Sequence, residues 1–471
     1  MPAFLLLLLT GLRLVVAAVT PLAPDEGYYW IWSRALAPGY LDHPPMVALW
    51  IRLGTLVTGD DALGVRLLGP ISAAIGSLML WDAANRLYPE QRPGVTAAVL
   101  LNATLMVGAG SVTMTPDTPL LFFAVLTLWA LARVGCDARW WIVAGAGIGL
   151  GLESKYTAVL LAIAPVIWIA GLPRWEWLRS AYPWLGAAVA AALFAPVVAW
   201  NAGHSWASFA KQGGRAENWV PQQAVQHLLE LLGGQIGLAT PLIAVLLGAG
   251  LWQAWGAARR RDPAGLLLIA LVVPGLLLFL EHTVSARVQP NWLAILYPPL
   301  AIGAAVAGKT WWRVAAGFGF ALTALVYLQA AAAPFPLPRR LDPTLARLAG
   351  WTELAAAADR MRRGQGLAFV ASDDYGPAAE LAWAAPRGAA VIGVEDRWRL
   401  FRLPQAQAAT GLLLISERRH QRPDPAFWRD TVPIGRVIRA RDGLEAEAFQ
   451  VYRATLVMGA PAVLLPRPGG E

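Results

Sequence analysis

Long apolar blocks fill most of this chain and alternate with short polar segments. Runs of about 18 or more apolar residues are long enough to cross a bilayer as helices. The pattern predicts a polytopic α-helical membrane protein with about eleven transmembrane helices, several of them short or tilted. The blocks cover approximately residues 3–22, 62–85, 94–114, 118–134, 140–152, 156–171, 182–200, 226–256, 264–280, 292–308 and 311–331.

The pattern changes after residue 333, where Pro334, Pro336 and Pro338 indicate a linker. Helical and strand periods alternate beyond it, and this alternation predicts a small α/β domain. Residues 1–333 are therefore expected to form the membrane domain and residues 334–471 the α/β domain. The segments that carry these periods are 352–363, 367–371, 376–384, 390–394, 412–415 and 434–438.

Composition supports a membrane protein, because 57% of the residues are hydrophobic and only 14% are charged. The single cysteine excludes an internal disulfide framework. The net charge of +8 comes mostly from arginines between the apolar blocks, which fits the positive-inside rule better than a nucleic-acid site.

The loop charges predict the topology. Arginine-rich connections alternate with acidic ones, so the N-terminus is expected in the cytoplasm and the C-terminal domain in the periplasm of a bacterial inner membrane. The first block resembles a signal peptide in length but lacks a basic start, and we interpret it as a retained span. Arg13 within this block is expected to snorkel or to meet a lipid phosphate.

The first outer loop, about residues 23–60, holds the densest set of candidate groups. Asp25 and Glu26 follow Pro24 and precede Tyr28 and Tyr29. These acids suit the first turn of a helix, with the aromatics as an interfacial belt. They equally suit a general base beside a sugar site, because ionisable groups next to a span usually face a pocket.

Two further motifs belong to the predicted outer face. Asp42 and His43 precede two prolines and a second amphipathic segment, 46–57. His43 is a structural residue or a phosphate or metal ligand. Asp117 is a helix N-cap or a second carboxylate of the pocket. We expect no required cofactor, and Asp42 and His43 are the only candidate metal ligands.

Later polar segments add cations and hydrogen-bonding groups. Lys155 forms an internal pair with Glu153 or reaches a lipid phosphate, because a phosphate leaving group needs fixed positive charge. Amide, tryptophan and basic residues occur together in a second outer loop, about 201–223, and in a segment near 290. This mixture suits a carbohydrate-binding site or an aromatic belt at the membrane interface. The remaining candidates are Tyr156, His204, Arg215, Arg287 and Asn291.

Nucleotide-binding motifs are missing from the sequence: it has no P-loop and no Gly-rich dinucleotide fingerprint. The glycines at 145, 147, 149 and 151 alternate within one block and indicate close helix packing. An enzyme that faces outward would therefore need an activated donor carried by the membrane, such as a polyprenyl-phosphate sugar.

Several motifs in register resemble the bacterial dolichyl-phosphate-mannose–protein mannosyltransferase-like glycosyltransferases, family thirty-nine of the GT-C class, over roughly residues 20–300. The chain is also similar to the lipid A aminoarabinose transferases. The motifs are Pro-Asp25-Glu26-Gly-Tyr-Tyr-Trp, Tyr-Leu-Asp42-His43-Pro-Pro, Thr-Pro-Asp117-Thr-Pro, Ser-Lys155-Tyr156-Thr, Trp-Asn201 with His204, and Pro-Asn291-Trp.

The resemblance implies an inverting transferase that moves a sugar from undecaprenyl phosphate or a similar lipid to an acceptor hydroxyl on lipid A, another glycolipid, a glycan or a protein. Asp25 matches the catalytic base, and Asp117 a second pocket acid. Lys155, Arg215 and Arg287 are the candidates for the donor phosphate. His43 stands where the aminoarabinose transferases have a lysine. The substrate-binding set is Glu26, Tyr28, Tyr29, Asp42, His43, Asp117, Lys155, Tyr156, His204, Arg215, Arg287 and Asn291.

The main alternative is a transporter or lipid flippase, since about eleven spans with buried charge suit one. Transporters commonly contain internal repeats, and none is evident here. Another alternative is a scaffold whose periplasmic domain binds partners. It would explain residues 334–471 but not the pocket expected at the outer face.

Overall fold

The computed structural model describes residues 3–172, 174–214, 221–308 and 310–469. Contacts divide the chain into two compact units, a larger one of residues 1–15, 38–47 and 67–327 and a smaller one of 16–37, 48–66 and 328–471. Three helices contribute residues to both units: α1 (Ala3–Val19), α3 (Met46–Thr58) and α17 (Trp312–Ala332).

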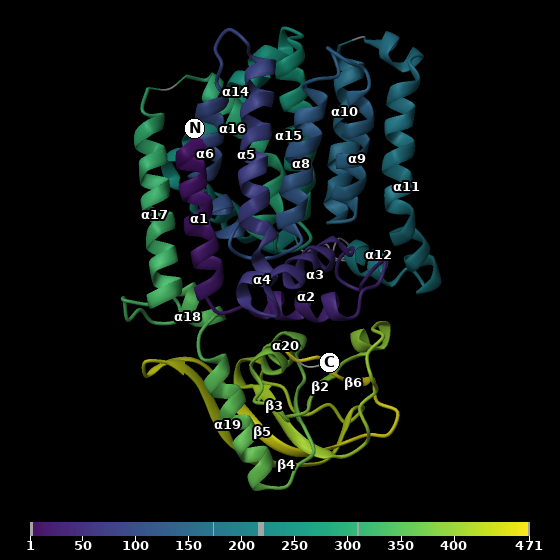
Figure 1. Ribbon diagram of the computed structural model, residues 1–471, viewed down its shortest axis with the longest axis vertical. Coiled ribbons are helices and arrows are strands. Elements are labelled where there is room, and N and C mark those ends of the chain that lie inside the picture. The colour runs from purple at the N-terminus through teal and green to yellow at the C-terminus, as the bar shows by residue number, and fades with distance from the viewer. Residues whose placement is uncertain (1–2, 173, 215–220, 309, 470–471) are drawn as a thin grey trace. The chain divides into compact units, whose positions relative to one another are not determined.

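The larger unit is helical, and its long helices run side by side (Figure 1). Five helices among the described residues are long and apolar enough to cross a membrane, or six if the bent pair α1 and α2 (Pro24–Arg34) counts as one. The coarse prediction of a polytopic helical protein is thus confirmed. The remaining elements of this unit are α5 (Leu68–Leu87), α6 (Gly94–Asn102), α7 (Leu105–Gly110), α8 (Asp117–Leu131), α9 (Trp140–Leu152), η1 (Tyr156–Ala158), α10 (Val159–Gly171), η2 (Trp175–Arg179), α11 (Ala181–Gly203), α12 (Ala207–Gly213), η4 (Pro221–Gln223), α13 (Ala224–Ala239), α14 (Pro241–Arg259), α15 (Pro263–His282), η5 (Pro290–Leu296) and α16 (Tyr297–Val306).

The alternating glycines of α9 pack closely against their neighbours, as predicted. A methyl group built on Gly145 would lie 2.0 Å from the carbonyl oxygen of Gly186 in α11, and one on Gly147 would lie 2.5 Å from Oγ1 of Thr127 in α8. Small residues let helix backbones approach in this way, and the close approach supplies van der Waals contact that lipid cannot replace.

Gly250 and Gly248 of α14 allow this packing to be tested. A methyl on Gly250 would lie 2.2 Å from the backbone nitrogen of Ala304 in α16, whereas one on Gly248 would meet nothing within 4 Å. Gly250→Ala is therefore expected to destabilise the protein by about 1–3 kcal/mol through overpacking. Gly248→Ala should be neutral or stabilising by up to about 1 kcal/mol, from helix propensity. Thermal unfolding of both variants in one detergent measures the difference, and equal midpoints would contradict the close contact.

Arg13 corrects one sequence prediction. The side chain neither snorkels nor reaches a lipid phosphate, because it is only 1% exposed and its Nη1 donates to Oδ1 of Asn102 at 2.8 Å. Asn102 in turn donates to Oγ of Ser77. A buried guanidinium is tolerated where polar partners replace water, and this set supplies them inside the larger unit.

The smaller unit contains a six-stranded sheet in the order β4-β5-β3-β1-β2-β6 (Figure 1). β1 pairs in parallel with β2 and β3, and the other pairs are antiparallel. Helices α19 and α20 contact the central strands and each other. The elements are α4 (Ala62–Arg66), α18 (Pro343–Arg347), α19 (Trp351–Gly364), β1 (Val370–Ser372), α20 (Tyr375–Ala384), β2 (Val391–Val394), η6 (Asp396–Leu400), β3 (Thr410–Ser416), η7 (Glu417–Arg419), β4 (Trp428–Arg441), β5 (Leu444–Leu456) and β6 (Ala462–Leu464).

All six periodic segments predicted after residue 350 correspond to α19, β1, α20, β2, β3 and part of β4. Strands β5 and β6 were not predicted. Alternate residues of the inner strands form the core, with Ala371 of β1 beside Ile392 of β2 and Leu413 of β3. The expected α/β character is thus confirmed for the C-terminal segment.

Candidate active site

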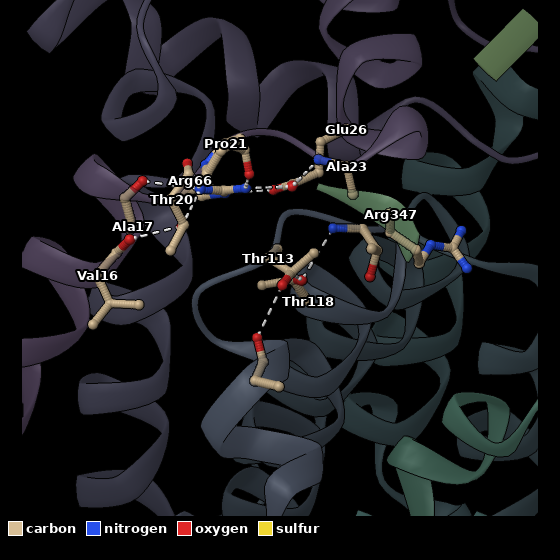
Figure 2. Close-up of polar contacts among 12 residues, drawn as sticks. Val16, Ala17, Thr20, Pro21, Ala23, Glu26, Arg66, Thr113, Thr118 and Arg347 are labelled. Carbon is tan, nitrogen blue, oxygen red and sulfur yellow. Dashed lines mark hydrogen bonds and ion pairs between the residues drawn. The ribbon is translucent and has the colours of Figure 1, made fainter. Parts of the chain in front are cut away.

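A buried ion pair between Glu26 and Arg66 lies at the turn between α1 and α2 (Figure 2). The chain bends there by 87°. The two carboxylate oxygens of Glu26 accept hydrogen bonds from Nε and Nη2 of Arg66 at 2.7 and 2.6 Å. The same guanidinium donates to the carbonyl oxygens of Ala17, Thr20 and Pro21. Glu26 is fully buried and Arg66 is 2% exposed, so this pair sets the direction in which α2 leaves the bend.

Asp25 lies beside this pair, in the first turn of α2, as the sequence indicated. Its Oδ2 forms an ion pair with Nη2 of Arg347 at 2.9 Å, and its Oδ1 accepts a hydrogen bond from the Tyr375 hydroxyl at 3.3 Å. The carboxylate remains 36% exposed. Arg347 ends α18 and Tyr375 begins α20, and sequence reasoning identified neither.

The turn from β1 to α20 positions Tyr375. Asp374 caps α20 by accepting from the backbone N–H of Gly376 at 3.2 Å, and it is paired with Arg419. The loop leaves the carboxyl end of a central parallel strand, where functional loops of α/β sheets commonly lie. Burial raises the pKa of the neighbouring Asp373 to about 6, although Arg419 opposes this shift.

Aromatic residues join α2 to the C-terminal segment. The ring of Tyr28 lies 4.6 Å from that of Tyr375 and 5.7 Å from that of Trp398, centroid to centroid. Arg397 donates to the Tyr28 hydroxyl at 3.3 Å. Tyr28 and Tyr29 are both buried. Edge-to-face aromatic contacts contribute beyond their buried area, so they hold α2 firmly behind Asp25.

A second polar group lies in the larger unit and joins three predicted residues. Asp117 accepts from Nζ of Lys155 at 2.7 Å and from Nδ2 of Asn291 at 2.6 Å. Lys155 therefore pairs with Asp117, and the alternative Glu153–Lys155 pair is wrong. Asp117 begins α8 but its carboxylate binds these side chains, so the N-cap alternative is wrong as well. We call Asp117, Lys155 and Asn291 the polar triad.

An apolar cavity of about 260 Å³ adjoins the polar triad. Its wall consists mainly of small and apolar residues of α5, α7 and α8, while Asp117 and Asn291 of the triad also line it. The wall includes Gly69, Ala73, Gly76, Leu101, Leu105, Met106, Val107, Leu121, Phe122, Val125 and Leu238. Hydroxyl residues complete the wall, so the cavity is largely apolar with one charged end: Ser72, Ser77, Ser111, Thr113, Thr115 and Thr118.

Other predicted residues form separate contacts in the larger unit. Asp42 pairs with Lys211 at 2.9 Å, and its carbonyl oxygen accepts from Gln212. The Tyr156 hydroxyl lies 2.7 Å from Oγ of Ser208. His43 is half-buried.

Two further predicted residues have local partners, and a third cannot be placed. His204 stacks on Trp200 at 4.2 Å between ring centroids, and Arg287 pairs with Glu230 at 2.8 Å. Arg215 lies outside the described residues.

Metal binding has no structural support in the described part of the chain, where no group of three or more His, Cys, Asp or Glu residues could hold an ion. Asp42 and His43, the candidate pair, therefore lack a third ligand of these types among those residues. Asp42 is instead paired with Lys211, and Asp117 with Lys155.

The fold combines long apolar helices with a six-stranded mixed sheet and the helices that contact it. The crystal structure of ArnT from Cupriavidus metallidurans bound to undecaprenyl phosphate matches this fold with a TM-score of 0.63, covering 95% of this chain and 97% of that one at 16% identity. The same protein in the apo state matches with a TM-score of 0.59.

Sequence comparison points the same way. Residues 42–200 match the family described as dolichyl-phosphate-mannose-protein mannosyltransferase. The chain is 29% identical over 279 residues to lipid A galacturonosyltransferase RgtD of Rhizobium johnstonii, covering 58% of each protein. It is 27% identical over 265 residues to the undecaprenyl phosphate-alpha-4-amino-4-deoxy-L-arabinose arabinosyl transferase of Pseudomonas aeruginosa, covering 52% of this chain and 46% of that protein.

The resemblance expected from the sequence motifs is thereby confirmed. The chain spans about half the length of the curated relatives it matches.

Proposed function

We propose that this protein transfers a sugar from a polyprenyl-phosphate donor to a hydroxyl group of an acceptor at the outer face of a bacterial inner membrane. The observation that carries the proposal is the largely apolar cavity that adjoins the polar triad, whose cation is Lys155. A polyprenyl phosphate is an apolar chain with an anionic end, which this cation can attract. The relatives named for undecaprenyl phosphate and lipid A support it.

In this proposal Asp25 is the general base. It removes the proton from the acceptor hydroxyl, whose oxygen attacks the anomeric carbon from the side opposite the phosphate. The bond between the anomeric carbon and the phosphate oxygen breaks, the configuration inverts, and polyprenyl phosphate leaves with the bonding electrons. A partly exposed carboxylate suits the role, because it is reachable and is oriented by Arg347 and Tyr375.

Lys155 is proposed to stabilise the charge that grows on the leaving phosphate. Its ammonium lies 2.7 Å from Asp117 and 5.7 Å from the Trp292 ring centroid, so it is held in place before the donor binds. Glu26 serves the site through Arg66 by fixing the helix that carries Asp25. The remaining predicted substrate contacts, Tyr28, Tyr29, Asp42, His43, Tyr156, His204, Arg215, Arg287 and Asn291, stay proposals.

Lys155→Met is expected to lower kcat/KM for the donor by about 10²–10³-fold, the usual effect of losing one fixed group that stabilises transition-state charge. Steady-state transfer from an undecaprenyl-phosphate-linked sugar by the purified protein measures it. Arg139→Gln is the control, because Arg139 is 74% exposed and pairs only on the surface with Asp137. Unchanged donor kinetics in Lys155→Met would contradict the role.

Sugar and acceptor are tested together by lipid mass spectrometry of a deletion strain beside its complemented control. The names of the relatives suggest aminoarabinose or galacturonic acid on lipid A. A mass difference of one such sugar that returns on complementation supports the proposal, and identical lipid profiles in both strains would contradict it for lipid acceptors.

The proposed topology retains about eleven spans, with the shorter apolar helices counted alongside the long ones. In this topology the N-terminus is cytoplasmic, residues 1–333 form the membrane domain, and residues 334–471 form a periplasmic domain. Cysteine labelling from the outside of cells tests it, since a cysteine placed in β4 should react and the native Cys136, between α8 and α9, should not.

A further inference from the structure

The smaller unit contains a cavity of about 690 Å³ that the proposed reaction has not used. One part of its wall comes from the ends of two apolar helices, with Ala18 and Val19 of α1 and Ala330 of α17. The other part comes from the α/β segment and includes Trp351, Glu353, Glu380, Trp383, Arg441 and Asp442. The cavity is therefore apolar where membrane helices end and polar beyond that point.

Glu380 is the unusual member of this wall. Glu380 is only 1% exposed, and its Oε1 has no hydrogen-bond partner among the described residues. A buried carboxyl oxygen without a partner costs stability, and a ligand in the cavity that donates a hydrogen bond to it would offset that cost. Burial raises the pKa of Glu380 well above its usual range, and nearby Glu26 adds to the rise.

The ionised groups of the wall disfavour an anionic ligand. Glu353 and Asp442 line it with one cation, Arg441, whose guanidinium already binds Asp342 and Thr344. Two carboxylates beside one guanidinium that is already paired weaken the binding of a phosphate. Hydroxyl groups can donate to carboxylates, and the half-buried Trp383 offers an apolar ring against which a sugar ring can pack.

We infer that this cavity binds the uncharged sugar headgroup of a glycolipid acceptor, with the lipid chains running along the ends of α1 and α17. That the bound glycolipid is the acceptor rests on the proposed function. Binding of the glycolipid does not depend on catalysis. Glu380 accepts a hydroxyl hydrogen bond in this arrangement, or donates one when it is protonated.

Native mass spectrometry of the full-length protein in detergent tests the inference. The probes are a monoglycosyl diacylglycerol, a phosphatidylglycerol with the same acyl chains, and undecaprenyl phosphate. The wild-type protein is expected to retain the glycosyl lipid in preference to phosphatidylglycerol. Glu380→Leu and Trp383→Ala should each weaken glycosyl lipid binding by about tenfold or more, the loss expected for one hydrogen bond or ring contact at a buried site. Binding of undecaprenyl phosphate should stay unchanged.

Asp396→Asn is the control, because Asp396 lies in the same segment but is 79% exposed and paired with Arg399. Glu380→Leu should unfold at the same temperature as the wild type or higher, since it removes a buried group without a partner. Thr352→Trp provides a second variant that fills the cavity from its exposed rim and leaves Glu380 intact.

Equal glycosyl lipid binding by the wild type, Trp383→Ala and Thr352→Trp would overturn the inference, as would equal retention of phosphatidylglycerol. Failure of the wild type to bind undecaprenyl phosphate would instead count against the proposed donor and leave the glycolipid site standing.

Discussion

Asp25→Asn is expected to lower the rate of sugar transfer by about 10²–10⁴-fold, the range that general-base catalysis contributes. Asparagine keeps the size of the side chain, its oxygen can still accept from Arg347 and its amide can donate to the Tyr375 hydroxyl, but it cannot take the proton of the acceptor hydroxyl. The loss should therefore appear in kcat, while binding of undecaprenyl phosphate remains at the wild-type level. Single-turnover transfer with saturating donor measures the chemical step directly.

Asp137→Asn is a closely matched control for this variant. Asp137 is 38% exposed against 36% for Asp25, and each carboxylate pairs with an arginine at 2.9 Å. A general effect of removing a half-exposed ion pair would lower both activities alike. If Asp25→Asn retained transfer within threefold of the wild type while folding normally, Asp25 would not be the base.

Arg66→Met is expected to cost about 3–5 kcal/mol of folding stability, the usual penalty for leaving one member of a buried ion pair alone. The loss should be at the upper end, because Arg66 also donates to three carbonyl oxygens at the bend between α1 and α2. The variant should accumulate poorly and unfold at a much lower temperature. Fluorescence-detected size-exclusion chromatography after heating measures both properties.

The double variant Glu26→Leu with Arg66→Met should recover part of this loss, because no charge is then left buried without a partner. Arg399→Met serves as the control, since its pair with Asp396 is exposed and worth less than about 1 kcal/mol. A stable Arg66→Met protein that keeps full activity would mean that the bend does not depend on the pair.

The sequence predicts much of the fold because both main signals are local. Apolar blocks locate the long helices, and period changes after residue 350 locate six elements of the α/β segment. The sequence also contains a signal for the hairpin of β4 and β5, because the pair Asp442-Gly443 is typical of a two-residue hairpin turn. These residues form the tight turn, with φ angles of 51° and 79°. The alternation of charged and apolar residues over 444–449 is a strand pattern as well.

The candidate site was predictable in residue type but not in pairing. Asp117, Lys155 and Asn291 each stand out as polar groups beside apolar helices, yet only the folded chain shows that they bind one another. Arg347 and Arg66 look like ordinary surface arginines in sequence. Their roles come from tertiary contacts with Asp25 and Glu26, which no local pattern records.

The two partners of Asp25 have a consequence for the timing of synthesis. Arg347 and Tyr375 follow it by 322 and 350 positions. At about 5–20 residues per second, a ribosome needs on the order of tens of seconds to make that intervening stretch. The N-terminal carboxylate is synthesised long before the groups that orient it exist. A nascent chain therefore cannot assemble this arrangement, and a product cut short before Arg347 would carry the proposed base without either of these two partners.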